Sequence, residues 1–131
     1  MNAGQTLRDF LAGLAPVQGL CPEGLALEGR AGPGLGALCF AGQAARSADI
    51  AGNVTRVLRW RLWLARPALT DAARTGTQAQ CEALRTALET AALPAGCEAL
   101  TAAPVRCETA GPGGESAYCM DLELTVTERM E

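Results

Sequence analysis

Apolar and polar residues alternate strictly between Val54 and Ala65, which is the clearest pattern in the chain. One set of positions carries large apolar residues: Leu58, Trp60, Leu62 and Leu64. The other set carries Arg59, Arg61 and Trp63. Because successive side chains of a strand point to opposite faces, this pattern predicts an antiparallel strand with one face buried and the other exposed.

Two weaker strands are expected before it. Residues 25–28 (Leu-Ala-Leu-Glu) could form a short strand, and residues 36–45 place Leu38 and Phe40 on one face. Residues 46–53 are mostly small or polar, which predicts a polar connection.

Two segments have helical periodicity. In residues 5–14 the apolar residues share one helical face: Leu7, Phe10, Leu11 and Leu14. Pro16 should stop this helix, because proline lacks the backbone N–H that a helix interior needs. In residues 70–92 the apolar residues recur every three or four positions: Cys81, Leu84, Leu88 and Ala91. This spacing predicts an amphipathic helix.

Two details of the second helix follow from its sequence. Gly76 costs roughly 1 kcal/mol in a helix interior relative to alanine, so a start at Thr77 is an alternative to a start at Thr70 or Asp71. Arg85 and Glu89 are four residues apart, the spacing of an ion pair on the solvent side.

The C-terminal third predicts a hairpin of residues 98–108 and 117–127, joined by a glycine-rich turn. Matching the apolar faces pairs Val105 with Met120, Cys107 with Tyr118 and Ala103 with Leu122, and puts Cys107 and Cys119 on opposite faces. Pro104 has no N–H to donate, so the first strand should lie at an edge or contain a bulge.

Together these elements predict an α+β fold: a single, mostly antiparallel sheet of four to five strands with two helices packed on one face. The 131 residues are expected to form one domain, residues 1–131.

Charge and composition exclude several functions. The net charge is −3, the basic residues are all arginine without a basic run, and histidine is absent. Binding to a nucleic-acid backbone needs clustered positive charge, so no nucleic-acid partner is expected. Without histidine, Ser-His-Asp and Cys-His chemistry are excluded. No apolar run is long enough to span a bilayer and no signal peptide is evident, so we expect a cytosolic chain without a membrane partner.

Six cysteines and two carboxylates are the remaining candidates for chemistry. The cysteines have irregular spacing and no C-x-x-C, so buried thiols are expected in preference to disulfides or a zinc site. Asp121 and Glu123 share a strand face, with Glu108 and Glu115 nearby, as an acid–base or metal pair would. The alternative, which we favour, is a solvated face neutralised by Arg59 and Arg61. No catalytic residue, cofactor or metal ligand is therefore predicted.

The order of elements suggests a family. A strand runs from Asn53 to Trp63-Leu64, and a helix holds Cys81-Glu-Ala-Leu-Arg-Thr-Ala-Leu-Glu. A Leu93-Pro94 step, a strand with Ala99-Leu-Thr-Ala-Ala103 and the strand Ala117-Tyr118-Cys-Met-Asp-Leu-Glu-Leu-Thr-Val126 follow. The pattern resembles the minor capsid or tail terminator proteins of long-tailed bacteriophages and prophages. It covers residues 25–128, of which residues 31–52 match poorly.

The resemblance implies a structural role without covalent chemistry. Such proteins form a hexameric ring that caps the tail tube and meets the head connector. The implied partners are other copies of the chain, the tail tube protein and the head–tail connector protein. The implied location is the head–tail junction of the virion, after assembly in the bacterial cytoplasm. The candidate interface residues are Arg46, Asp49, Asn53, Arg59, Arg61 and Trp63.

Three alternatives remain open. The chain could be another phage neck or head–tail joining protein, or a small cytosolic adaptor that binds a partner as a monomer. An enzyme using a cysteine or the carboxylate pair would need a deep pocket and a strongly perturbed titratable group.

Overall fold

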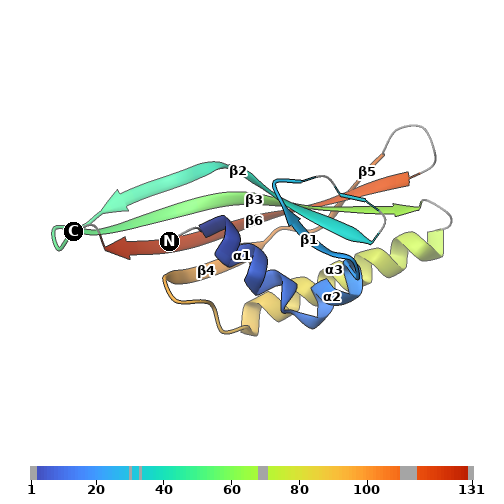
Figure 1. Cartoon of the computed structure of the whole chain (residues 1–131), viewed down its shortest axis with the longest axis horizontal. Coiled ribbons are helices and arrows are strands. Elements are labelled where there is room, and N and C mark those ends of the chain that lie inside the picture. Colours follow the sequence, from blue (N-terminus) through green and yellow to red (C-terminus); the bar gives the residue numbers. More distant parts are fainter. Residues whose placement is uncertain (1–2, 30, 33, 68–70, 110–114, 130–131) are drawn as a thin grey trace.

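A computed structural model describes residues 3–29, 31–32, 34–67, 71–109 and 115–129, which form three helices and six strands (Figure 1). The helices are α1 (Ala3–Ala12), α2 (Ala15–Leu20) and α3 (Asp71–Thr90). The strands are β1 (Gly24–Leu27), β2 (Leu35–Ala48), β3 (Asn53–Pro67), β4 (Cys97–Ala102), β5 (Arg106–Thr109) and β6 (Glu115–Arg129).

The strands form one mixed sheet in the order β1-β2-β3-β6-β4, and β5 pairs with the same strand β6. Only the β1–β2 pair is parallel; the other pairs described are antiparallel. The predicted α+β class with a single, mostly antiparallel sheet is therefore confirmed.

The strand that alternates most clearly forms the centre of the sheet. Strand β3 pairs with β2 on one side and with β6 on the other. The residues predicted to face the core, Leu58, Trp60, Leu62 and Leu64, are buried. So are the matching positions of β6: Tyr118, Met120, Leu122, Leu124 and Val126. Leu7 and Leu11 of α1 and Leu84 and Leu88 of α3 complete this core. All three helices lie below the central strands in Figure 1, and their buried residues belong to one core.

A third helix corrects the prediction at Pro16. The residue does not end a helical segment; it lies in the first turn of α2. Proline fits there because the first N–H groups of a helix have no intrahelical partner and its φ is already helical. Val17 and Leu20 of this short helix are buried in the core.

Among the described residues, the structure has six strands where four to five were predicted. The difference arises because the predicted strand 98–108 is split into β4 and β5. Cys107 pairs with Tyr118 as expected, but Leu122 pairs with Ala102 and not with Ala103. Pro104 lies between β4 and β5, where it interrupts the ladder, and one extra residue is accommodated there. Cys119 pairs with Arg106, so Cys107 and Cys119 occupy adjacent rungs of the ladder and are not directly opposite each other.

Helix α3 begins at Asp71 and includes Gly76, so the alternative start at Thr77 is wrong; Thr70 lies outside the described residues. Arg85 does not show the predicted pairing with Glu89. Its Nη1 donates to Glu82 at 2.8 Å, and its Nε donates to the carbonyl of Ala102 at 3.1 Å. The guanidinium turns toward β4 because the packed sheet offers it an acceptor.

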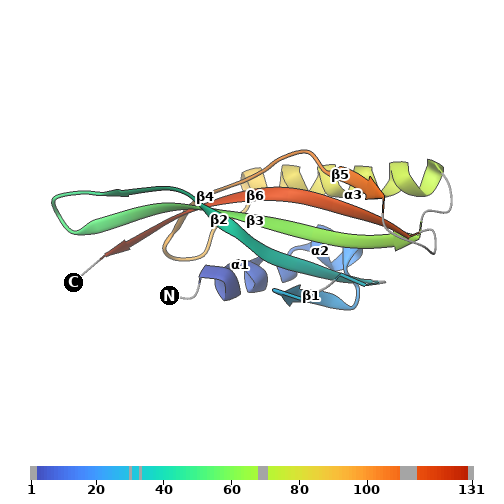
Figure 2. The same cartoon turned by 90° about the horizontal axis from the view of Figure 1, so that it is seen from above.

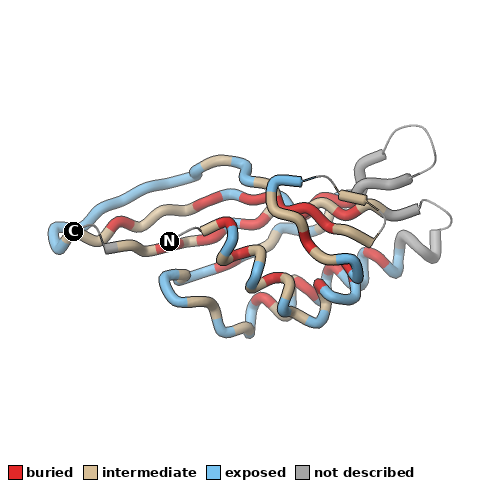
Figure 3. Tube along the Cα trace, in the orientation of Figure 1, coloured by how far each residue is buried: buried red, intermediate tan, exposed pale blue. Residues whose placement is uncertain are grey.

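Half of the polar connection predicted for residues 46–53 is strand. Strand β2 continues to Ala48, and only residues 49–52 form the turn to β3. We call residues 43–57 the arm. The arm extends past the helices at one end of the molecule (Figure 2). Its β2 half is exposed to solvent, whereas Val54 in its β3 half is buried (Figure 3).

Candidate protein-interaction site

The face of the sheet opposite the helices carries a ladder of ion pairs, and we call it the open face. Arg59 Nε lies 3.3 Å from Glu123 Oε1, and Arg61 Nε lies 3.3 Å from Asp121 Oδ1. Arg106 Nη2 approaches the second oxygen of Asp121 at 3.4 Å. All five side chains are about half exposed. Exposed pairs contribute about 1 kcal/mol or less each, so the ladder sets the charge pattern more than the stability.

This ladder confirms the interpretation of Asp121 and Glu123 as a neutralised face. Each carboxylate is engaged by an arginine from the neighbouring strand, as strand register requires. The two pairs border a surface hollow of about 340 Å³, which Ala41 also lines. A depression walled by paired charges suits a polar or charged group of another protein better than an apolar ligand.

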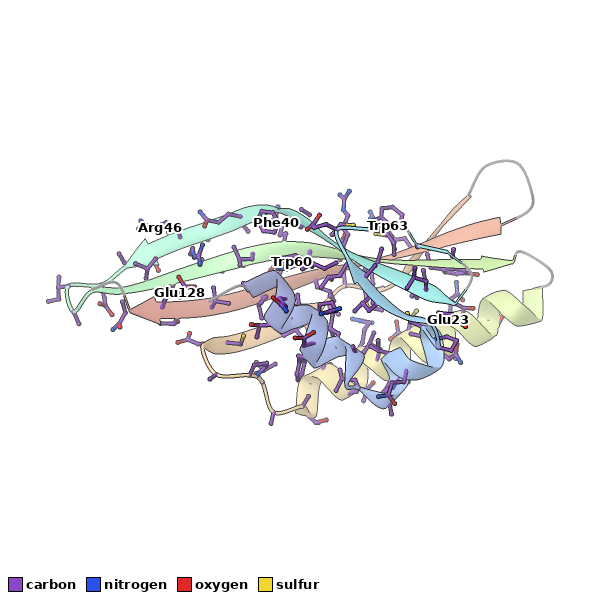
Figure 4. All side chains as sticks on the ribbon, viewed as in Figure 1. Glu23, Phe40, Arg46, Trp60, Trp63 and Glu128 are labelled. Carbon is purple, nitrogen blue, oxygen red and sulfur yellow. The ribbon has the colours of Figure 1, made fainter. Side chains whose placement is uncertain are left out.

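Trp63 lies on the open face one step beyond Arg61. Its cross-strand neighbours are Ala37 and Cys119, both fully buried although they face away from the helices. Trp63 is half-buried beside them (Figure 4). Its ring therefore belongs to a packed patch, and only part of it is available to a partner.

The turn of the arm has a fixed conformation. Asp49 Oδ1 accepts hydrogen bonds from the N–H groups of Ala51 and Asn53, both at 2.9 Å, and Oδ2 accepts one from Asn53 Nδ2 at 3.0 Å. The hydrogen bond from the backbone N–H of Asn53 is the largest cause of a lowered pKa of Asp49, and the other hydrogen bonds of the turn lower that pKa further. Gly52 takes the positive φ of 91° that the turn needs. Asp49 and Asn53 thus shape the turn, and Ile50 at its apex is fully exposed.

Arg46 differs from the other arginines whose side chains the structure describes, because it forms no ion pair. It lies directly opposite Arg56 in the β2–β3 ladder. Arg56 is paired with Glu128 at 3.0 Å. Like charges directly opposite each other destabilise a strand pair, and no acidic side chain among the described residues neutralises Arg46, which is labelled in Figure 4.

The thiols do not form a reactive cluster in the part of the chain described. Cys21, Cys39, Cys81, Cys97 and Cys119 are not in disulfides; the side chain of Cys107 lies outside the described residues. Burial raises the pKa of Cys39 and of Cys97, and the negative charge of Glu28 raises that of Cys39 further.

No group of three or more acidic or cysteine side chains that could hold a metal occurs among the described residues. Within the same residues, no helix has the length and apolar character that crossing a membrane requires.

The six predicted interface residues fall on two surfaces. Arg59, Arg61 and Trp63 lie on the open face, whereas Arg46, Asp49 and Asn53 lie on the arm. Sequence reasoning missed Ile50, although an isoleucine inside a polar turn was a usable signal. It also missed an apolar hollow between α2 and β1, which no local pattern marks.

Comparison with known proteins does not add a family to this description. The chain matches no protein-family model and no curated protein.

Proposed function

We propose that the chain is a non-enzymatic structural subunit that forms a homo-oligomeric ring at the end of a bacteriophage tail. In this role it caps the tail tube and joins it to the head connector. Its partners are copies of itself, the tail tube protein and the head–tail connector protein. It would be assembled in the bacterial cytoplasm and reside in the virion at the head–tail junction.

The arm is the observation that carries the proposal. Together with the end of β6, it extends the sheet beyond the helices that cover the rest, and its β2 edge has no neighbouring strand among the described residues (Figure 2). Exposed strand edges pair readily with other chains, so proteins usually shorten, cover or charge them. An arm that is ordered by its own hydrogen bonds yet buries little is suited to contact another subunit.

The open face supports the same role. Asp121 and Glu123 each form an ion pair with an arginine of β3, which favours binding to another protein over acid–base catalysis. The sequence pattern that resembles tail terminators supplies the ring and the tail as the context of that recognition.

Light scattering coupled to size-exclusion chromatography tests the proposal, followed by negative-stain imaging. We expect particles of several chains with a ring outline. A strictly monomeric chain at the highest attainable concentration, with no ring in the presence of tail tubes, would contradict it. A monomer that captures one phage protein would instead support the adaptor or head–tail joining alternative.

A further inference from the structure

We propose that the subunits of the ring join head to tail, with Ile50 of one copy seated in the apolar hollow between α2 and β1 of the next. In the same contact, Arg46 of the arm faces Glu23 beside that hollow. This inference rests on the proposed function, because it requires the chain to associate with itself.

Ile50 has the features of an inserted side chain. It is fully exposed, and the turn that carries it is held by the three hydrogen bonds to the Asp49 carboxylate. A single exposed apolar residue is common on protein surfaces. Ile50 is unusual because a rigid turn presents it at the far end of a projecting arm. Binding would order little of this chain, so little conformational entropy opposes it.

The hollow provides a matching receptor. It measures about 160 Å³ and is lined mainly by apolar residues, among them Val17, Cys21, Pro22 and Leu25. An apolar cavity of about 150 Å³ can hold a benzene-sized group, so this one accommodates the four-carbon side chain of isoleucine. Gln18 lines the same hollow and is exposed, with its amide bonded to the carbonyl of Ala12.

Charge complementarity supports the same pairing. Arg46 lies opposite Arg56 and forms no ion pair with the residues that the structure describes. Glu23 stands between two residues that line the hollow, is exposed, and takes part in no ion pair of the described residues. Arg46 precedes Ile50 by four residues, which span at most roughly 13 Å of extended chain. When Ile50 occupies the hollow, the extended side chains of Arg46 and Glu23 together bridge most of that distance.

The positions of the two features determine the symmetry. The tip of the arm and the α2–β1 region lie apart along the long axis of the molecule in both orthogonal views (Figures 1 and 2). One chain therefore cannot fill its own hollow. Contact between two different patches is heterologous, and it closes into a ring when the rotation between copies divides a full turn.

A mixing experiment tests this geometry. Ile50→Asp removes the insert but leaves the hollow, and Gln18→Trp covers the hollow but leaves the insert. Each variant alone should lose the oligomer, with an apparent dissociation constant raised roughly ten-fold or more, about 1.4 kcal/mol. In an equimolar mixture, Ile50 of the Gln18→Trp chain can still enter the hollow of the Ile50→Asp chain. The mixture should therefore form this one contact and sediment as a dimer. Ala51→Ser, beside Ile50 in the turn, is the matched control and should assemble normally.

A charge exchange tests the second contact. Arg46→Glu and Glu23→Arg should each weaken assembly, and the double variant should restore it. If the wild type forms oligomers that Ile50→Asp leaves intact, or if the charge exchange fails to restore assembly, this contact is wrong while the proposed function stands. A wild type that never associates, even on tail tubes, refutes the proposed function itself.

Discussion

Two helical glycines, Gly4 and Gly76, have opposite roles. A Cβ on Gly4 of α1 would lie 2.7 Å from Cη2 of Trp60, so glycine permits the close approach of this helix to β3. Gly76 lies exposed in α3, and a Cβ added there would meet nothing within 4 Å. The same substitution should therefore have opposite signs at the two sites.

We expect Gly76→Ala to raise the free energy of unfolding by about 0.5–1 kcal/mol, the helix-propensity difference. Gly4→Ala should lower it by about 1–3 kcal/mol, because the methyl group displaces a packed indole. Urea unfolding followed by circular dichroism measures both. Equal effects of the two substitutions would contradict the packing described for Gly4.

Cys39 offers a test of local electrostatics. Burial and the charge of Glu28 raise the pKa of its thiol above the ordinary 9.0, and only the thiolate reacts with alkylating reagents. Glu28→Gln should therefore speed alkylation of Cys39 at pH 8, while the amide oxygen can still accept the hydrogen bond from the N–H of Phe40. Cys97, whose pKa is raised by burial alone, is the internal control. Peptide mass spectrometry measures both rates, and equal acceleration at the two sites would refute the assignment.

At the scale of elements, the turn of the arm should respond to acid. The folded pKa of Asp49 lies below the ordinary 3.8 because Asn53 donates to its carboxylate. Its stabilising contribution is therefore complete above pH 3.8 and disappears as the pH falls through the lowered folded value. The amide NMR signals of Ala51 and Asn53 should titrate with an apparent pKa below 3.8. Asp49→Asn keeps an acceptor without a charge, so in that variant neither signal should titrate in this range.

Which elements could be predicted depended on where their stabilising contacts lie. Strand β3 and the buried positions of β6 were predictable, because alternating burial leaves a period of two in the sequence. Strand β2 continues beyond the predicted end at Ala45 through Arg46, Ser47 and Ala48, which are exposed, and it is a strand there because β3 pairs with it. The predicted partner of Arg85 was wrong for a related reason, since the carbonyl of Ala102 reaches it only through the packing of α3 on the sheet.

At the scale of the whole molecule, the open face can be tested separately from the arm. We expect Arg59→Glu combined with Arg61→Glu to abolish the ring, because it reverses the charge of a predicted contact surface. The same change also removes the arginine partner of Glu123 and leaves Asp121 with Arg106 alone. The control, the fourfold exchange, adds Asp121→Arg and Glu123→Arg, which restores the pairs at positions 59 and 61 with reversed polarity. It also carries Arg106→Gln, because Arg106 contacts Asp121 and would repel a cation at that position.

Light scattering distinguishes the outcomes. A ring lost in the double variant and still absent in the fourfold exchange assigns the open face to an intersubunit contact. A ring that returns in the fourfold exchange shows that the loss came from the sheet of a single subunit. An unchanged oligomer in the double variant removes Arg59 and Arg61 from the interface.

The sequence by itself determined the fold class, the central strand and the paired charges of the open face. Each of these follows from the period of side chains within single elements, because the apolar and charged faces of the two long strands can be matched on that basis. Only the tertiary structure decided the parallel pairing of β1, the helix that begins near Pro16, the projecting arm and the apolar hollow beside α2. These depend on which segments meet in space, and contacts between distant residues leave no period in a single sequence.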